Sequence, residues 1–384
     1  MSLRRILMVC EPGEYGVLIY LRKLVAYLQE HHKGVLIDYV YSSRRGSSQQ
    51  KKLIASIREK GGDTLDLNIG NGPEMRDIPA FLALGRFIRK TSPDLIHAHS
   101  SKAGILSRAW AVLPGCPPVL YSPHGYYGMA GRKGVKTHFF NALESIFGRL
   151  GCTHNVSEYE RAFGIDTLRL PPDRLVTIVS GINRSTFCPV SPAQKLALRR
   201  KLGLPEVGRL LVTVGRDGYE KNQLAIYQAL PRALAAPARF FAHAGWGSSE
   251  LRASLDPQTK DKVFTYSYLD RPEELLQAAD GFIMTSRSEA FGLAAFEALC
   301  CGLPLMVTAT TGLLTLRNLK HANVHWLPNP AEANSITDEI VSAIDDWAIA
   351  PEADEAAQVA EAALHFDETA QFDKIFELYQ KLAR

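Results

Sequence analysis

Short runs of consecutive hydrophobic residues alternate along the chain with longer segments in which apolar residues recur every three or four positions. The run at 5–10 (RILMVC) precedes a helical pattern at 17–32, and further strand-like runs follow at 34–42, 94–100 and 118–125. Uninterrupted apolar runs are typical of strands that are buried on both faces, and strands that alternate with helices form a parallel sheet. The pattern therefore predicts an α/β domain in the first half of the chain.

A second series of the same kind begins near Ser191, after a hinge expected around 182–192. It contains strands at 209–216, 238–245, 263–269, 281–286 and 303–309, with helical patterns between them. The pattern predicts two Rossmann-like α/β/α domains, at 1–185 and 186–365. A last amphipathic helix within 366–384 is expected to pack back toward the N-terminal domain.

Composition narrows the class of protein without naming its chemistry. The 384 residues carry a net charge of +4, which is too small to indicate nucleic-acid binding. The six cysteines show no metal-like spacing, which favours reduced thiols in a cytosolic protein. The N-terminal apolar run is too short for a signal peptide, and no run is long enough to cross a membrane. We therefore expect a cytoplasmic protein.

Positive charge is nevertheless concentrated in one segment, residues 42–60, which contains six cations and a single acid, Glu59. Such a segment can simply be a solvated surface. It can also be a polybasic patch that faces anionic lipid head groups. The loop AGRKGVK, residues 130–136, would favour the same membrane surface.

Several polar residues directly follow predicted strands, where ligands bind in open α/β sheets. His97 and His99 lie two apart at one strand end, and His124 follows the next strand beside a glycine. A structural role remains the alternative for each histidine. No acid or further histidine stands at helical spacing near them, so the pattern does not favour a metal site.

The loop after the first strand, and the loop after the strand at 209–216, are both suited to phosphate. Gly16 lies just before a helix, where a backbone without a side chain lets a ligand approach the free N–H groups. Arg216 and Lys221 follow a strand within a glycine-containing loop, and two cations there suit a diphosphate. A plain turn and solvated loop charges are the alternatives.

The stretch SEAFGLAAFEALCCGLP, residues 288–304, contains two carboxylates among small and apolar residues. Glu289 is expected in a loop after a strand, and Glu297 about one turn into the following helix. The helix dipole explains an acid at Glu289. It does not explain Glu297, which projects from an apolar helix where an unpaired carboxylate is costly.

These motifs together resemble the retaining GT-B glycosyltransferases of family 4. Glu289 and Glu297 are spaced like the two glutamates of that family's E-x7-E segment, and residues 214–223 resemble its Arg…Lys diphosphate loop. Residues 179–189 resemble its hinge-side turn. The segments ending in His99 and His124 resemble its acceptor-side strand ends. The resemblance runs through essentially the whole chain.

The resemblance implies a role for each matching residue. Arg216 and Lys221 would bind the donor diphosphate and stabilise the leaving group. Glu297 would hold the ribose hydroxyls, and Glu289 would orient the donor sugar. His124 would lie near the reacting face of the sugar, with His97 and His99 on the acceptor side. The remaining donor contacts implied are Gly16, Tyr268, Ala290, Phe291, Gly292 and Leu293.

The same resemblance implies a metal-independent enzyme with no cofactor. It would use a UDP-, GDP- or ADP-linked sugar and a lipid-linked or polysaccharide acceptor, as in cell-surface polysaccharide or glycolipid synthesis. Peripheral binding to the inner face of the cell membrane is the added hypothesis. A GT-B nucleotide-sugar epimerase is the alternative. An NAD-dependent dehydrogenase is disfavoured by the missing GxGxxG, and a silent binding protein by the complete set of charged residues.

The chain departs from the family pattern at several positions. Tyr15 replaces a glycine in the first loop, Ser180 an asparagine and Asn183 an aspartate in the hinge-side turn, and Ser267 a glycine. After residue 310 the sequence TGLLTLRNL replaces a double glycine and an acid. Because that segment would adjoin the donor sugar, the choice of sugar stays open.

Overall fold

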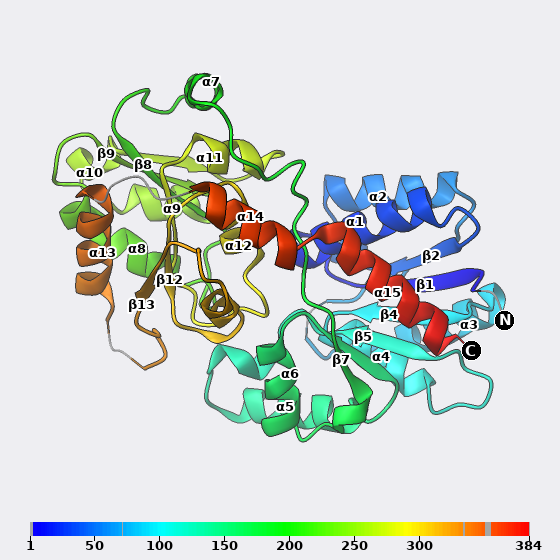
Figure 1. Cartoon of the computed structure of the whole chain (residues 1–384). Coiled ribbons are helices and arrows are strands. Elements are labelled where there is room, and N and C mark those ends of the chain that lie inside the picture. Colours follow the sequence, from blue (N-terminus) through cyan, green and yellow to red (C-terminus); the bar gives the residue numbers. More distant parts are fainter. Residues whose placement is uncertain (1–2, 71, 333–334, 350–354, 384) are drawn as a thin grey trace. The chain divides into compact units, whose positions relative to one another are not determined.

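The chain folds into two compact units in the computed structural model, which describes residues 3–70, 72–332, 335–349 and 355–383 (Figure 1). Unit 1 comprises residues 1–128, 132–179 and 369–384, and unit 2 comprises 129–131 and 180–368. The chain thus passes between the units near Val179, where the sequence indicated 185, and the last helix, α15 (Glu368–Leu382), belongs to unit 1 from Thr369 onward.

Unit 1 is built on a seven-stranded parallel sheet in the order β3-β2-β1-β4-β5-β6-β7. The order reverses direction between β1 and β4, which is the switch point where doubly wound folds bind ligands. The strands are β1 (Arg5–Cys10), β2 (Leu36–Tyr41), β3 (Thr64–Asp66), β4 (Leu95–His99), β5 (Val119–Ser122), β6 (Cys152–Asn155) and β7 (Leu175–Thr177).

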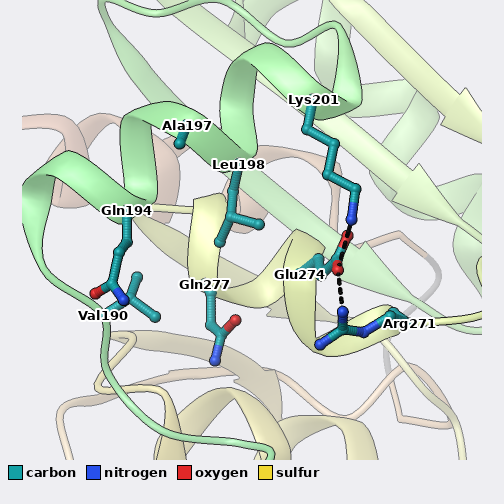
Figure 2. A pocket seen from close by; sticks show the side chains of 8 residues that line it. All are labelled: Val190, Gln194, Ala197, Leu198, Lys201, Arg271, Glu274 and Gln277. Atoms are coloured by element: carbon teal, nitrogen blue, oxygen red, sulfur yellow. Dashed lines mark hydrogen bonds and ion pairs between the residues drawn. The ribbon is translucent and has the colours of Figure 1, made fainter.

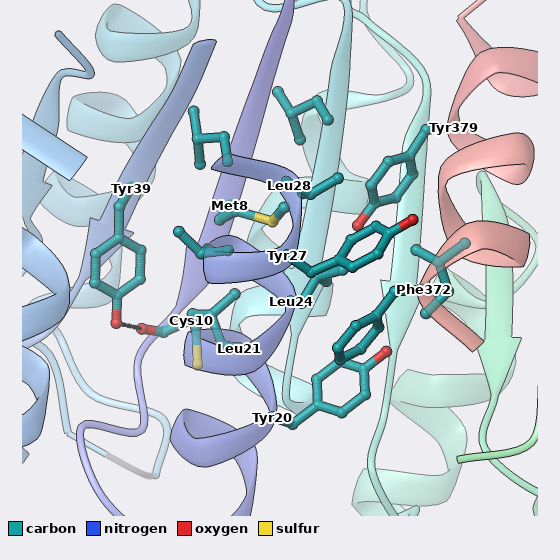
Figure 3. Close-up of a cluster of buried hydrophobic side chains, with 14 of the residues drawn as sticks. Met8, Cys10, Tyr20, Leu21, Leu24, Tyr27, Leu28, Tyr39, Phe372 and Tyr379 are labelled. Atoms are coloured by element: carbon teal, nitrogen blue, oxygen red, sulfur yellow. Dashed lines mark hydrogen bonds between the residues drawn. The ribbon is translucent and has the colours of Figure 1, made fainter. Parts of the chain in front are cut away.

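Helices cover both faces of this sheet. A buried cluster joins strand residues to α1, α2 and α15, with Tyr20, Phe372 and Tyr379 packed together at one end (Figure 3). The remaining helices follow later strands, and α4 contacts β1, β4 and β5. The helices of unit 1 are α1 (Tyr15–His31), α2 (Ser48–Glu59), α3 (Asp77–Thr91), α4 (Ser101–Trp110), α5 (Val135–Phe147), α6 (Glu158–Asp166) and the short η1 (Ser43–Arg45), η2 (Tyr127–Ala130) and η3 (Pro172–Arg174).

Unit 2 repeats the plan with six parallel strands in the order β10-β9-β8-β11-β12-β13, so its switch point lies between β8 and β11. Its strands are β8 (Arg209–Val214), β9 (Arg239–Ala244), β10 (Val263–Tyr266), β11 (Gly281–Met284), β12 (Leu305–Thr308) and β13 (Val324–Leu327). Helices α8 and α13 pack on each other and on these strands through a buried apolar cluster.

The helices of unit 2 begin and end as follows: α7 (Pro192–Leu202), α8 (Gln223–Ala233), α9 (Ser248–Ala253), α10 (Pro257–Lys260), α11 (Pro272–Ala278), α12 (Leu293–Cys300), η4 (Thr311–Asn318), α13 (Thr337–Ile349) and α14 (Glu355–His365). Some are fixed by local signals that the sequence displays. Ser191 and Gln194 form a reciprocal capping box at the start of α7, and Gly203 ends that helix in the left-handed region at φ +68°.

The strands expected from apolar runs are present, although most are shorter than the runs. The structure adds elements that the apolar pattern did not indicate, namely β3, β13, α5, α6, α9, α10 and α13. None of the helices within the described residues is both long enough and apolar enough to cross a membrane.

Candidate functional site

The functional residues expected in unit 2, apart from Tyr268 after β10, gather at its switch point. Gly215 and Arg216 directly follow β8, and the segment 285–292 follows β11. Because these two strands are neighbours in a parallel sheet, both loops emerge at the same carboxyl edge. Residues more than sixty positions apart in the sequence therefore meet there.

The strongest contact at this edge joins Lys221 to Glu289. The Lys221 ammonium lies 2.7 Å from Oε1 and 2.9 Å from Oε2 of the Glu289 carboxylate. Only 8% of Glu289 is exposed, whereas the Lys221 side chain keeps about a quarter of its surface in solvent. The lysine is thus placed to meet an incoming anion while it neutralises a buried acid.

Glu289 is held by further contacts that the sequence reading did not include. The Ser286 hydroxyl donates to its Oε1 at 2.6 Å. The Thr311 hydroxyl accepts from the Glu289 N–H at 2.8 Å and donates to its carbonyl oxygen at 2.7 Å. Thr311 achieves this with φ +25°, a region that β-branched residues rarely occupy. Both side chain and backbone of Glu289 are therefore fixed before any ligand binds.

Arg216 lies on the same edge with its charge still accessible. Its guanidinium contacts the carboxylate of Glu220 at 3.4 Å, a half-exposed pair on one turn. Gly215 and Gly218 have φ values of +151° and +159°, and a Cβ at Gly218 would come within 2.5 Å of the Arg216 guanidinium. The glycines therefore shape this loop around the arginine.

Helix α12 starts directly after the Glu289 loop. Gly292 has φ +96°, and a Cβ there would lie 2.5 Å from the Leu313 side chain, so only glycine fits. The first N–H groups of this eight-residue helix have no partner within it. Leu293, Ala294 and Glu297 form its half-buried face, whereas Ala295, Phe296 and the last three residues are buried.

This face changes the interpretation of Glu297. The sequence suggested that Glu297 projects from a helix that is apolar and buried on every side. In the structure Glu297 lies on the half-buried face, which it shares with Leu293 and Ala294 at the start of the helix. Ala290 is half-buried and Phe291 is buried against Phe296 and Phe366. Tyr268 lies in the loop after β10, largely exposed, with its hydroxyl donating to Asp270.

In unit 1, His124 follows β5 in an unusual backbone conformation. Its φ of +54° and that of Gly125, +104°, both lie in the left-handed region. The turn is held by the buried carboxylate of Glu160, which accepts from the N–H groups of Gly125 at 2.6 Å and Val156 at 2.7 Å. Strained backbone that is fixed by a buried group is typical of functional sites.

His99 supports the ring of His124, with its Nδ1 3.0 Å from Nε2 of His124. Burial lowers the pKa of His124 to about 3 and that of His99 well below its usual range, so both rings are neutral at pH 7. His99 Nε2 has no partner among the described residues. A buried N–H without a partner is rarer than a buried acceptor without one, so His99 Nε2 is best assigned as the unprotonated nitrogen. His99 then has its proton on Nδ1 and donates it to Nε2 of His124. His124 in turn has its proton on Nδ1, which can donate to a ligand.

His97 belongs to a separate buried series of hydrogen bonds, and the carbonyl at its end fixes which atom donates in each of them. The Ile178 carbonyl can only accept, so His154 Nε2 donates to it at 3.0 Å and His154 Nδ1 accepts from the Ser122 hydroxyl at 2.8 Å. The Ser122 oxygen then accepts from His97 Nε2 at 2.8 Å, and His97 Nδ1 accepts from the Tyr379 hydroxyl at 2.5 Å.

The two acceptor-side histidines of β4 are thus less accessible than the sequence suggested. Both His97 and His99 are completely buried, and both ring nitrogens of His97 are engaged. In this structure they can act on a ligand only through their neighbours. Gly16, in contrast, is exposed in the first turn of α1, with open space where a side chain would project.

Two other features do not coincide with these residues. A shallow cavity of about 320 Å³ lies between α7 and α11, and Lys201 and Arg271 both pair with Glu274 in its wall (Figure 2). None of the residues expected to bind a ligand lines it. Across the described part of the chain, no group of three or more histidine, cysteine or acidic side chains is arranged to hold a metal ion.

Sequence reasoning thus identified residues that gather at the carboxyl edge of each sheet but missed the side chains that hold them. Ser286 and Thr311 carry no motif signal, and Glu160 lies 36 positions after His124 in an ordinary helix start. Only the glycine beside His124, Gly125, gave a sign that the backbone there is unusual.

Comparison with known proteins agrees with this arrangement. Residues 194–363 match the model of the glycosyl transferases group 1, and residues 16–186 match that of glycosyltransferase family 4. A UDP-Gal:α-D-GlcNAc-diphosphoundecaprenol α-1,3-galactosyltransferase of Escherichia coli is 30% identical over 252 residues, covering 62% of this chain and 63% of that protein. A D-inositol 3-phosphate glycosyltransferase of Salinispora arenicola is 30% identical over 58% of this chain and 55% of its own length.

The chain spans about half to two thirds of the length of the curated relatives it matches. Among solved structures, HepE of Anabaena in complex with UDP and glucose is 18% identical, with a TM-score of 0.76 over 98% of this chain and 99% of that one. The predicted fold class, two Rossmann-like domains of the GT-B type, is confirmed.

Proposed function

Because the chain belongs to the group 1, family 4 glycosyltransferases, we propose that it transfers a sugar from a nucleotide-diphosphate-sugar donor to a lipid-linked or polysaccharide acceptor, with retention of configuration at the transferred carbon. The E. coli relative, whose name gives a UDP-linked donor and a diphosphoundecaprenol acceptor, supports a UDP-sugar and a lipid-linked acceptor in cell-surface glycan synthesis. A protein with this task would work at the inner face of the cell membrane.

The Lys221–Glu289 pair beside Arg216 is the observation that carries the proposal. Two cations and the N–H groups at the start of α12 lie on one sheet edge, where a donor diphosphate would find fixed positive charge. These groups would neutralise the leaving nucleotide without a metal ion or other cofactor. Glu289, Ala290, Phe291 and Gly292 would border the sugar, and Leu293 would donate its N–H to a phosphate.

Residues of unit 1 would contact the acceptor and would also contact the donor. His124 would present its Nδ1–H to the sugar or the acceptor, with His99 as a positioning residue behind it and His97 further back. Gly16 would let the donor approach the start of α1. Tyr268 would contact the nucleobase.

The proposal is tested by incubating the purified chain with UDP-, GDP- and ADP-sugars in the presence of a chelator, with and without a short-chain polyprenyl-diphosphate-sugar acceptor. We expect a glycosylated acceptor from one UDP-sugar, and stabilisation against heat by UDP rather than GDP or ADP. Conversion of the donor sugar without any acceptor would instead support the epimerase alternative. Activity that disappears with the chelator would contradict the metal-independent proposal.

Replacing Glu297 by alanine is expected to weaken UDP binding by about tenfold to a hundredfold, because a carboxylate that accepts from ribose hydroxyls contributes roughly 1.5–3 kcal/mol. Titration calorimetry measures the change. UDP that lacks the ribose 2′-hydroxyl should bind the wild type more weakly but show little further loss with Glu297→Ala. The exposed Glu250→Ala serves as the control of equal charge. Unchanged UDP affinity in Glu297→Ala would remove the ribose assignment.

Replacing Thr311 by valine is expected to lower kcat/KM by about tenfold, since two hydrogen bonds to the backbone of Glu289 are lost. Thr311→Ser keeps the hydroxyl and should retain most of the activity. Steady-state kinetics of the three proteins provide the measurement. If serine and valine reduced kcat/KM equally, the hydroxyl would have no positioning role and the effect would belong to the backbone strain at this residue.

A further inference from the structure

Unit 1 exposes its large hydrophobic side chains in a restricted region. Nine of them are exposed in the described part of this unit, and all but Ile19 lie on α3, on α5 or on the segments that adjoin α3 and α4. The eight are Met75, Ile78, Leu82, Val112, Leu113, Val135, Phe139 and Ile146. Single exposed apolar residues are normal on protein surfaces, but such concentration marks an interaction surface.

Helix α5 shows the feature most clearly, because it carries apolar residues on its exposed face as well as half-buried ones, Phe140, Leu143 and Phe147. The exposed fractions of Val135, Phe139 and Ile146 are 87%, 48% and 61%, and these residues are spaced along one face of the helix. The buried residues of the same helix are Thr137 and Glu144. A surface helix of a water-soluble domain normally turns its apolar stripe inward.

The inward carboxylate of Glu144 explains how the helix is held. Glu144 pairs with the completely buried Arg108 of α4 at 2.8 Å and accepts from the Tyr121 hydroxyl at 2.8 Å. The Arg108 guanidinium also stacks over the Tyr121 ring at 3.9 Å. Removing one partner of a buried pair is strongly destabilising, so these contacts fix which face of α5 points outward.

The start of α3 repeats the pattern. Met75, Ile78 and Leu82 are exposed on and just before its first two turns. The one acid of this helix, Asp77, is occupied by Lys102, whose ammonium lies 2.6 Å away and also donates to the carbonyls of Gly70 and Gly72.

The exposed charges within the two helix ranges are cations. No acid is exposed within residues 75–90 or 131–150, since Asp77 is half-buried and Glu144 is buried. The exposed cations of these two ranges are Arg76, Arg86, Arg89, Lys90, Lys133, Lys136 and Arg149. One of them, Lys90, pairs with the partly exposed Asp63 at 3.1 Å. An apolar stripe that is bordered mainly by cations complements a surface with negative head groups over an acyl layer.

The sheet places both stripes on one side of the unit. Helix α4 contacts α3 on one flank and α5 on the other, and α1, α2 and α15 cover the opposite face of the sheet (Figure 1). Neighbouring helices pack 8–10 Å apart, so α3 and α5 form two ridges separated by about 20 Å. Both helices begin at the carboxyl edge of the sheet, the edge to which His124 belongs.

We propose that α3 and α5 form a docking surface for an anionic lipid bilayer, with Ile78, Leu82, Val135 and Phe139 inserted among the acyl chains and the surrounding cations on the head groups. This inference rests on the proposed transfer to a lipid-linked acceptor. It adds which face meets the membrane and brings the carboxyl edge of unit 1 to the interface. A symmetric dimer through this face is disfavoured, because it would place the cations of one copy against those of the other.

The surface includes the basic loop 130–136 that the sequence indicated, but it differs from the other basic segment, 42–60. In α2 the residues Lys51, Lys52 and Arg58 are exposed, but no large apolar side chain is exposed on that helix, and Arg44 is paired with Glu74. Segment 42–60 thus has charge without an insertion face. Lys51, Lys52 and Arg58 therefore supply a matched control in the same unit for a variant that removes three cations from the surface.

The test is flotation of the full chain with vesicles of phosphatidylcholine and phosphatidylglycerol in equal amounts, or of phosphatidylcholine alone. We expect salt-sensitive binding to the mixed vesicles only. Lys133→Gln/Lys136→Gln/Arg149→Gln should weaken binding about a hundredfold, at about fivefold for each cation. Ile78→Ser/Phe139→Ser should weaken it at least tenfold, whereas Lys51→Gln/Lys52→Gln/Arg58→Gln should change it less than threefold at matched ionic strength.

Three results would overturn the inference: no flotation of the wild type, an equal loss in the α2 variant, or binding that the apolar variant leaves intact. Sedimentation equilibrium distinguishes a second copy of the chain, because self-association abolished by Phe139→Ser would assign the face to a dimer. Transfer from UDP-sugar to a short-chain, water-soluble acceptor tests the proposed function separately. A variant that still transfers sugar to the soluble acceptor but no longer binds vesicles is folded. If the wild type binds vesicles as expected but transfers no sugar, the proposed function fails and the docking surface does not.

Discussion

Replacement of Lys221 by alanine is expected to lower kcat/KM for the donor sugar by about a hundredfold to a thousandfold, the usual loss when a group that stabilises developing negative charge is removed. The ammonium of Lys221 is the cation closest to Glu289 and is partly exposed at the sheet edge, where the donor diphosphate would lie. Its removal takes away charge from the leaving nucleotide and leaves a buried carboxylate at Glu289 that repels the phosphates.

The structure offers a matched control for this change. Lys201 and Glu274 form an ion pair of the same kind, 2.7 Å apart with a buried carboxylate, in the cavity between α7 and α11 (Figure 2). Lys201→Ala should leave kcat/KM within about twofold of the wild type, since it removes a lysine from a buried glutamate that lies outside the candidate site and that Arg271 still neutralises. Lys221→Arg, which keeps the charge, should retain more activity than Lys221→Ala.

A double-mutant cycle separates the two parts of the effect. If the unpaired Glu289 carboxylate accounts for much of the loss, Glu289→Gln combined with Lys221→Ala should lose less than the product of the two single effects. Steady-state kinetics with saturating acceptor give the four values. A Lys221→Ala enzyme with wild-type kcat/KM would show that the lysine serves only to neutralise Glu289.

The strands were readable from the sequence because both sheets are buried, and buried parallel strands leave continuous apolar runs such as residues 5–10. Helix α5 was not readable in the same way. Its apolar residues form two stripes, with Val135, Phe139 and Ile146 exposed and Phe140, Leu143 and Phe147 half-buried around the buried Glu144. The sequence pattern does not show which stripe covers the sheet, and the exposed one is what marks the helix as an interaction surface.

The site was predictable as far as chemistry follows strand ends. Arg216, Lys221 and Glu289 could be placed on one edge because β8 and β11 are neighbours. What holds them could not, since Thr311 reaches back 22 positions through a backbone conformation that no propensity indicates. The segment after residue 310, which departs from the family pattern, is thus the segment that fixes Glu289. Changes there are a physical route to altered donor choice.

The histidines of β4 show that the exposure of a predicted site residue could not be predicted from the sequence. Their spacing placed His97 and His99 on one face of the strand, and the structure agrees. Whether such a face meets solvent or the interior depends on α15, which contributes Tyr379 from 282 positions away. Sequence spacing alone contains no information about that contact.

Acid is expected to destabilise unit 1 by several kcal/mol between pH 7 and pH 5. Burial lowers the pKa of His124 to about 3 and of His154 to about 4, and lowers those of His97 and His99 well below their usual range. The folded chain therefore leaves these rings neutral where the unfolded chain protonates them, near pH 6.5. Stability is present above that pH and is lost as the pH falls, by about 2 kcal/mol for each histidine down to pH 5.

One carboxyl works against this loss. Burial raises the pKa of Glu160 to about 7, so the folded chain binds a proton there between about pH 7 and 4 that the unfolded chain releases. This group gains stability as the pH falls and offsets about one histidine. We therefore expect the chain to take up between two and three protons when unit 1 unfolds near pH 6. Because protons bind on unfolding, acid favours the unfolded state.

Hydrogen exchange of peptides from β4, β5 and β6, corrected for the intrinsic effect of pH on exchange, measures unit 1 separately from unit 2. His154→Gln supplies a group that cannot titrate yet can still donate and accept, and it should remove about 2 kcal/mol of the acid-dependent change. The exposed His138→Gln, in the same unit, should remove none of it. Protection against exchange that stays constant from pH 7 to pH 5 would contradict the prediction. It would show that the buried hydrogen bonds from Tyr379 to Ile178 take up a proton without local unfolding, and that the Ile178 carbonyl does not fix the tautomers of the histidines.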